Sequence, residues 1–221
     1  MQIDFYSYGV LRRTGKTLAA SFLLFGAAHA DQIDIVALGD SLTHGYGLVE
    51  QDGFVPRMRG WLAEQGSDVR LINAGVSGDT TAGGLARVDW TLTSEIDAMI
   101  VELGGNDVLR GIAPEVARAN LEGILRIAAN AQVEVLLVGM EAPGNYGPDY
   151  KTAFDAIYPD LADKYGTLYA ESFFAGLPGN DPASVRPYMQ ADGIHPNSKG
   201  VTLIVDELGP YVLELIDRAR R

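Results

Sequence analysis

Cysteine is absent from all 221 residues of the chain. The chain can therefore form no disulfide framework, no thiolate zinc site and no cysteine nucleophile. Histidine is scarce as well, and His44 and His195, the two that lie beyond residue 30, are too far apart in sequence to offer a metal-ligand spacing. We therefore expect no metal site.

Basic residues are few: 17 Lys and Arg stand against 29 Asp and Glu, which gives a net charge of −12 and a pI near 4.6. Nucleic acids are bound through a basic face that neutralises phosphates. The acidic composition therefore argues against a nucleic-acid partner. The length suits one domain with a well-buried core, and nothing in the sequence indicates an oligomeric state.

A long apolar run is also missing, because the apolar stretch at 17–28 is shorter than the roughly 20 residues of a membrane span. Positive residues precede this stretch, and Ala-His-Ala at 28–30 follows it as a cleavage signal. The pattern predicts a signal peptide over 1–30, cleavage after Ala30 and a single domain over 31–221. A membrane-anchoring or amphipathic helix at the amino terminus is the alternative interpretation.

Cleavage after Ala30 predicts a periplasmic or secreted protein without a stable membrane anchor. Residues 1–30 contain three basic residues and one acidic residue, a net charge of +2, so their removal changes the charge of the chain from −12 to −14. The processed chain is therefore even more acidic than the full one.

Strand and helix patterns alternate over the rest of the chain. Repeated strand–helix units imply a mainly parallel sheet covered by helices on both faces, an α/β fold. We predict strands at 33–38, 69–73, 98–103, 133–140 and 167–169, and helices at 54–65, 81–93, 114–130, 150–165 and 198–220.

Four short motifs follow one another along this pattern: Gly-Asp-Ser-Leu at 39–42, Ser-Gly-Asp-Thr at 77–80, Gly-Gly-Asn-Asp at 104–107 and Asp-Gly-Ile-His-Pro at 192–196. The first three each follow a predicted strand, and the fourth lies in the loop after the fifth strand. The carboxyl ends of parallel strands share one edge of a sheet, where open sheets bind their ligands. We therefore expect the four motifs to meet there.

These motifs supply the parts of a serine hydrolase. Ser41 would be the nucleophile, which needs a base at neutral pH, and His195 would be that base. Asp192 would orient the imidazole, since a tight turn at Gly193 could fold its carboxylate back onto the ring. His44 is the alternative base, although no carboxylate adjoins it in sequence.

The oxyanion that forms during attack needs preorganised N–H donors. We assign them to Ser41, Gly78 and Asn106. Gly78 has no side chain to obstruct the approach of its backbone N–H, and Asn106 can offer its amide. We interpret Asp79 and Asp107 as turn and cap residues.

The four motifs resemble those of the SGNH, or GDSL-type, hydrolase family, from residue 35 to about residue 213. Val-Glu-Leu-Gly-Gly-Asn-Asp at 101–107, Asp-Gly-Ile-His-Pro-Asn at 192–197, Asn-Tyr-Gly at 145–147 and Ala-Ile-Tyr-Pro at 156–159 are most similar to its bacterial thioesterase/lysophospholipase and arylesterase branch. The resemblance implies a flavodoxin-like five-stranded parallel sheet in a three-layer α/β/α fold, no cofactor, and hydrolysis of small esters, thioesters or lysolipids. It also places Asn145 and Tyr146 beside the substrate pocket.

We expect a serine esterase that acts on small aryl or short-chain acyl esters, with lysophospholipids next and thioesters as a further class. Two alternatives stay open: a carbohydrate deacetylase, and a non-catalytic binding module on the same fold. The presence of all five residues of the predicted site argues against the binding module. The scarcity of tryptophan, only Trp61 and Trp90, argues against sugar stacking.

Overall fold

Strands and helices alternate along the chain in a computed structural model that describes residues 1–2, 32–179 and 181–221. The predicted signal peptide, apart from Met1 and Gln2, lies outside the described residues. The strands are β1 (Ile33–Gly39), β2 (Val69–Gly75), β3 (Ala98–Glu102), β4 (Glu134–Val138) and β5 (Leu168–Ala170). The helices are α1 (Ser41–His44), α2 (Phe54–Glu64), α3 (Thr81–Thr91), α4 (Gly105–Leu109), α5 (Pro114–Asn130), α6 (Pro148–Asp155), α7 (Ile157–Tyr165), α8 (Pro182–Val185) and α9 (Ser198–Ala219). Short 3₁₀ helices occupy Glu50–Asp52, Gly144–Tyr146 and Arg186–Tyr188.

The five strands form one parallel sheet in the order β2-β1-β3-β4-β5. Because β1 lies between β2 and β3, the strand order reverses at β1, and a ligand site is expected beside such a reversal. In this register Gly39 pairs with Gly75 on one side and with Glu102 on the other. The segments that follow β1, β2 and β3 therefore start side by side.

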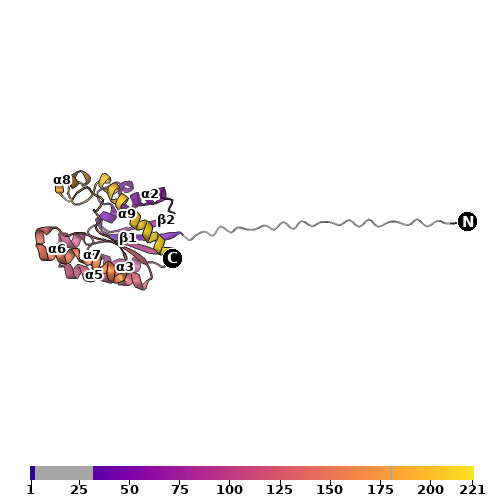
Figure 1. The fold of residues 1–221 in the computed structure, drawn as a ribbon, viewed down its shortest axis with the longest axis horizontal. Helices are drawn as coiled ribbons and strands as arrows, with labels where there is room; N and C mark the ends of the chain where they lie inside the picture. The colour runs from indigo at the N-terminus through magenta and orange to yellow at the C-terminus, as the bar shows by residue number, and fades with distance from the viewer. Residues whose placement is uncertain (3–31, 180) are drawn as a thin grey trace. The chain divides into compact units, whose positions relative to one another are not determined.

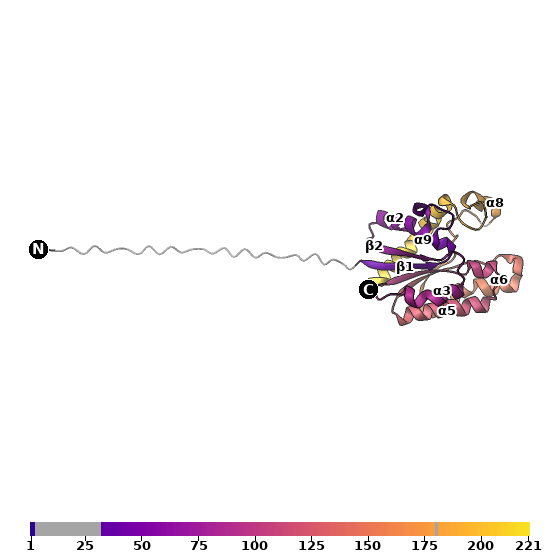
Figure 2. The same cartoon turned by 180° about the vertical axis from the view of Figure 1, so that it is seen from behind.

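Helices cover both faces of the sheet. Helices α2 and α9 lie on one face, and α3, α5 and α7 lie on the other (Figure 1, and from behind in Figure 2). Strands β1 and β3 are buried along their whole length, as expected for apolar strands in a sheet that is covered twice. The predicted three-layer α/β/α fold with a five-stranded parallel sheet is confirmed.

One predicted helix is divided. Residues 150–165 form α6 and α7, which meet at Ala156, instead of a single helix. Pro159 has no N–H to donate to the carbonyl of Asp155, so the hydrogen-bond ladder is interrupted there. Phe154 and Tyr158 are nevertheless fully buried, and Tyr158 Oη donates a hydrogen bond to the carbonyl oxygen of Leu103 at 2.9 Å, directly after β3.

Within the part of the chain that the structure describes, no helix combines the length and the apolar character that crossing a membrane requires.

Candidate active site

Ser41 is the first residue of α1, immediately beyond the end of β1. The buried Asp40 caps this short helix, because its Oδ1 accepts a hydrogen bond from the Leu42 N–H at 3.0 Å. The turn packs directly on the end of β2, where a Cβ on Gly75 would lie 2.3 Å from the backbone nitrogen of His44. The sharp turn therefore holds Ser41 at the carboxyl edge of the sheet.

His195 and Asp192 form a local turn in the segment before α9. Asp192 Oδ1 accepts hydrogen bonds from the backbone N–H groups of Ile194 at 3.0 Å and His195 at 3.1 Å. Its Oδ2 lies 2.7 Å from Nδ1 of His195. This is the folding back of the carboxylate that the position of Gly193, with φ of 68°, suggested from the sequence. The bond to His195, followed by the two backbone bonds, lowers the pKa of Asp192 to about 2.

The other ring nitrogen of His195, Nε2, lies 2.7 Å from Ser41 Oγ. Because an ionised carboxylate only accepts hydrogen bonds, Nδ1 must carry the ring proton, which leaves Nε2 free to accept one from the serine hydroxyl. The side chain of His195 is 15 % exposed. The arrangement can transfer a proton from Ser41 to His195 while Asp192 holds the ring.

The two other predicted oxyanion donors, Gly78 and Asn106, lie beside Ser41 and His195. Gly78 and Asn106 line one cavity together with Ser41 and His195. Gly78 has φ of 86°, a left-handed conformation that favours glycine. Asn106 lies in α4, and its Nδ2 donates one hydrogen bond to Asp40 Oδ2 at 3.0 Å. No other hydrogen bond from this amide nitrogen is found among the described residues, so its second N–H can be offered to a ligand.

The cavity has a volume of about 550 Å³, and its wall is mostly apolar. Of the charged side chains that line it among the described residues, three are acidic, namely Asp40, Glu141 and Asp192, and no Lys or Arg is present. Apolar lining is given by Leu42, Tyr46, Val108, Leu109, Phe174 and Ile194.

Asn145 and Tyr146, which the resemblance places beside the pocket, are not among its lining residues, although Pro143 of the same loop is. The Tyr146 ring instead lies against Tyr150, with the ring centroids 4.9 Å apart. Their part in substrate binding stays a prediction.

His44, the alternative base, makes a different contact. Its Nδ1 lies 3.3 Å from Ser77 Oγ, and among the described residues no hydrogen bond joins His44 to Ser41. The geometry therefore favours His195 over His44 as the partner of Ser41.

Two residues beside Ser41 and His195 were not identified from the sequence. The Tyr46 ring packs on the imidazole of His195, with centroids 4.8 Å apart. Gln190 joins the two loops, because its Nε2 donates to the carbonyl oxygens of Tyr46 at 2.8 Å and of Pro196 at 3.0 Å. Neither residue belongs to a local motif, so no sequence signal pointed to them.

A serine, an imidazole and a carboxylate in series are recognised as a hydrolytic relay by their geometry and roles, whatever their order along the chain. Here the relay lies at the carboxyl edge of an open parallel sheet. It borders a cavity that is also lined by Gly78 and Asn106, the two other predicted oxyanion donors. The class that the fold and these contacts define is that of the serine hydrolases.

Comparison with known proteins agrees with this class. The model of the GDSL-like lipase/acylhydrolase family matches residues 37–203. Esterase TesA of Pseudomonas aeruginosa is 39% identical over 183 residues, which cover 82% of this chain and 89% of that protein. The arylesterase of Vibrio mimicus is 33% identical over 201 residues, which cover 90% of this chain and 94% of that protein. The structure of the psychrotrophic esterase EstA from Pseudoalteromonas sp., inhibited by monoethylphosphonate, matches with a TM-score of 0.76 and 31% identity, covering 83% of this chain and 98% of that one.

The chain belongs to the GDSL-like lipase/acylhydrolase, or SGNH hydrolase, family and is a serine esterase, that is, a carboxylic ester hydrolase. The predicted family and class of enzyme are both confirmed.

Proposed function

We propose that Ser41 attacks the carbonyl carbon of a small ester and forms an acyl-enzyme that water then hydrolyses. The series of two 2.7 Å contacts, from Ser41 Oγ to His195 Nε2 and from His195 Nδ1 to Asp192 Oδ2, carries the proposal. His195 takes the serine proton as the new C–O bond forms and gives it to the departing alcohol as the old bond breaks. In the second half, His195 takes a proton from water, and the acid leaves as Ser41 recovers its proton.

The oxyanion of each tetrahedral intermediate is held by the backbone N–H groups of Ser41 and Gly78 and by the side-chain amide of Asn106. Such donors accelerate the reaction because they are already oriented when the charge develops. The bond from Asn106 to Asp40 supports this role, since it fixes the amide in one orientation.

The substrate is a neutral aryl or short-chain acyl ester, with lysophospholipids next in preference and thioesters of coenzyme A disfavoured. The largely apolar wall suits an acyl or aryl group, and three acidic side chains with no lining cation among the described residues oppose a polyanionic head group. Asn145 and Tyr146 bind the part of a larger substrate that extends beyond the cavity, towards the loop that contributes Pro143.

The enzyme acts outside the cytoplasm, after cleavage of residues 1–30. The positive residues, short apolar stretch and Ala-His-Ala cleavage signal of that segment support the assignment. Export would also separate the enzyme from cytosolic acyl-CoA, in keeping with the substrate preference.

A chain-length series of p-nitrophenyl esters, measured beside lysophosphatidylcholine and an acyl-CoA, tests this function. We expect the highest kcat/KM for short acyl chains, weak or no activity on the acyl-CoA, and no turnover by Ser41→Ala. Equal activity of Ser41→Ala and the parent would overturn the mechanism, and a preference for acyl-CoA would overturn the substrate assignment.

A further inference from the structure

We propose that Arg87 is a positioning residue for the oxyanion hole: its ion pair with Asp79 fixes the Gly78 N–H relative to Ser41. The inference rests on the proposed function, in which Gly78 is an oxyanion donor. Arg87 is in α3, nine residues beyond Gly78, and does not line the cavity.

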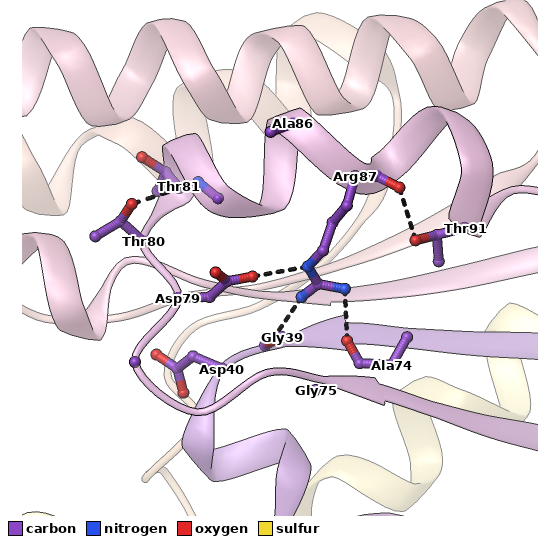
Figure 3. Close-up of polar contacts among 12 residues, drawn as sticks. Gly39, Asp40, Ala74, Gly75, Asp79, Thr80, Thr81, Ala86, Arg87 and Thr91 are labelled. Atoms are coloured by element: carbon purple, nitrogen blue, oxygen red, sulfur yellow. Dashed lines mark hydrogen bonds and ion pairs between the residues drawn. The ribbon is translucent and has the colours of Figure 1, made fainter.

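The guanidinium of Arg87 binds three separate segments of the chain (Figure 3). Its Nε donates to Asp79 Oδ2 at 2.7 Å, its Nη1 to the carbonyl oxygen of Ala74 at 2.7 Å, and its Nη2 to the carbonyl oxygen of Gly39 at 2.9 Å. The side chains of Arg87 and Asp79 are only 14 % and 18 % exposed, so this contact is largely withdrawn from water.

The three acceptors lie in the segments whose spacing determines the geometry of the oxyanion hole. Gly39 ends β1 two residues before Ser41, Ala74 lies near the end of β2, and Asp79 follows Gly78 directly. A guanidinium is a planar fork with fixed donor directions. One rigid group therefore holds the nucleophile's strand and the oxyanion loop at a set distance.

The loop has few other constraints at this point. Val76 N–H donates to Gly39 O and Asp79 N–H donates to Val76 O, each at 3.0 Å. Ser77 Oγ also lies 3.3 Å from His44 Nδ1, but that contact is exposed. The carbonyl oxygen of Gly78 accepts a bond from Arg110 Nη2 at 2.8 Å, but that contact is exposed. Arg87 thus supplies the protected constraint on Asp79, the residue that follows Gly78, and so limits how far the Gly78 N–H can shift relative to Ser41.

A second arginine–aspartate pair, whose arginine is more exposed than Arg87, gives a control at the other end of the same strands. Arg70 of β2 binds Asp34 of β1, with Nε 2.8 Å from Oδ1, so it joins the same two strands at their amino ends, opposite the site. If Arg87 only stabilised the fold, the loss of either arginine would leave kcat per folded molecule unchanged.

The test compares Arg87→Gln, Arg87→Lys and Arg70→Gln. kcat and KM are measured with p-nitrophenyl acetate, and active enzyme is counted from the final burst of p-nitrophenol with diethyl p-nitrophenyl phosphate. Loss of a whole oxyanion donor costs about 10²–10³ in kcat, so misplacement of one by Arg87→Gln should cost roughly 10-fold or more, with KM little changed. Arg87→Lys should fall between this variant and the parent, because a point charge cannot replace the fork.

A tetrahedral ligand gives a second readout. Phenylboronic acid forms an anionic adduct with a serine hydroxyl, so Arg87→Gln should weaken its inhibition by a factor similar to the fall in kcat. Arg70→Gln should change kcat and phenylboronic acid inhibition by less than about twofold. Equal kcat per active site in Arg87→Gln and Arg70→Gln would overturn the proposal.

Asp79→Asn covers the case in which the Arg87 variants do not fold, because it keeps the shape of the side chain while removing the ion pair. It should lower kcat and leave KM little changed, and an unchanged kcat would refute the role of the pair. Failure of the underlying function has a different signature: Ser41→Ala would then be as active as the parent.

Discussion

His195 Nε2 lies 2.7 Å from Ser41 Oγ, although 154 residues of sequence separate the two. Ser41 is fixed by the turn at the end of β1, and His195 is fixed by its own carboxylate turn and by the strand-like bridge between Met189 and Pro196. The contact therefore depends on two rigid local structures that the tertiary fold brings together.

The two histidines near the site can be told apart by mutation. We expect His195→Ala to reduce kcat by roughly 10⁴–10⁶, as for loss of a triad member, and the double variant Ser41→Ala/His195→Ala to be little worse than either single one, because these residues act as a unit. His44→Ala is the control: its ring contacts Ser77 and not Ser41, so activity on p-nitrophenyl acetate should be largely kept. The opposite pattern would make His44 the base.

Asn106→Ala should lower kcat by roughly 10²–10³ with little change in KM, because an oxyanion donor acts mainly in the transition state. The substitution also removes the 3.0 Å bond to Asp40, so the melting temperature is measured in parallel to separate folding from catalysis. A change confined to KM would instead make Asn106 a residue that binds the ground-state substrate.

The rate of hydrolysis tests the bond between Asp192 and His195. Because the pKa of Asp192 is lowered to about 2, this carboxylate is ionised throughout the active range and can hold the imidazole in the tautomer that carries its proton on Nδ1. Asp192→Asn should therefore reduce kcat by roughly 10⁴, because that tautomer is no longer fixed. A kcat equal to that of the parent would show that Asp192 does not orient His195.

The sequence was sufficient to predict the strands and the convergence of the four motifs. Ser41, Gly78 and Asn106 each follow a strand, and the ends of parallel strands meet at one edge whatever the details of packing. The turn that joins Asp192 to His195 was also predictable, because it is local.

Other features depend on contacts that no local pattern encodes. Arg87 binds acceptors in three segments, and Tyr46 reaches His195 only through the tertiary fold. The division between α6 and α7 has a local cause instead: the predicted single helix at 150–165 did not account for Pro159, which lacks the N–H that the helical ladder needs.

Export can be tested by the mass of the protein recovered from periplasm or culture fluid. The Ala-His-Ala signal at 28–30 predicts an amino terminus at Asp31. Intact-mass analysis should find a chain shortened by residues 1–30, and replacing Ala28 and Ala30 with bulky residues should block processing. Recovery of a product that retains residues 1–30 would contradict both the cleavage site and the proposed location.

Glu102 makes the stability of the fold depend on pH. Its carboxyl group is fully buried at the end of β3, accepts a hydrogen bond from Thr43 Oγ1 at 2.8 Å, and has no partner for Oε1 among the described residues. Burial, and then the negative charge of Asp40, raises the pKa of Glu102 well above its ordinary value of 4.5.

Between the pKa of the unfolded chain and the raised pKa of the folded protein, the folded state keeps a proton that the unfolded state has lost. The stability linked to Glu102 is therefore fully present below about pH 4.5 and falls as pH rises, by up to about 1.4 kcal/mol per pH unit. Glu102→Gln removes this titration while keeping the shape of the side chain. The free energy of unfolding of the variant, minus that of the parent, should therefore increase between pH 4.5 and 7 in urea titrations.

Glu122→Gln is the control of opposite sign. The bond from Lys164 lowers the pKa of Glu122, so the stability linked to Glu122 is present above the unfolded pKa and is lost as pH falls through the folded value. The same difference for Glu122→Gln should decrease as pH rises towards 4.5 and should then stay nearly constant from pH 4.5 to 7, where Glu122 is ionised in both states. A difference for Glu102→Gln that stays flat from pH 4.5 to 7 would mean that Glu102 ionises equally readily in both states. A fully buried carboxyl with no cationic partner in the described part of the chain should not do so.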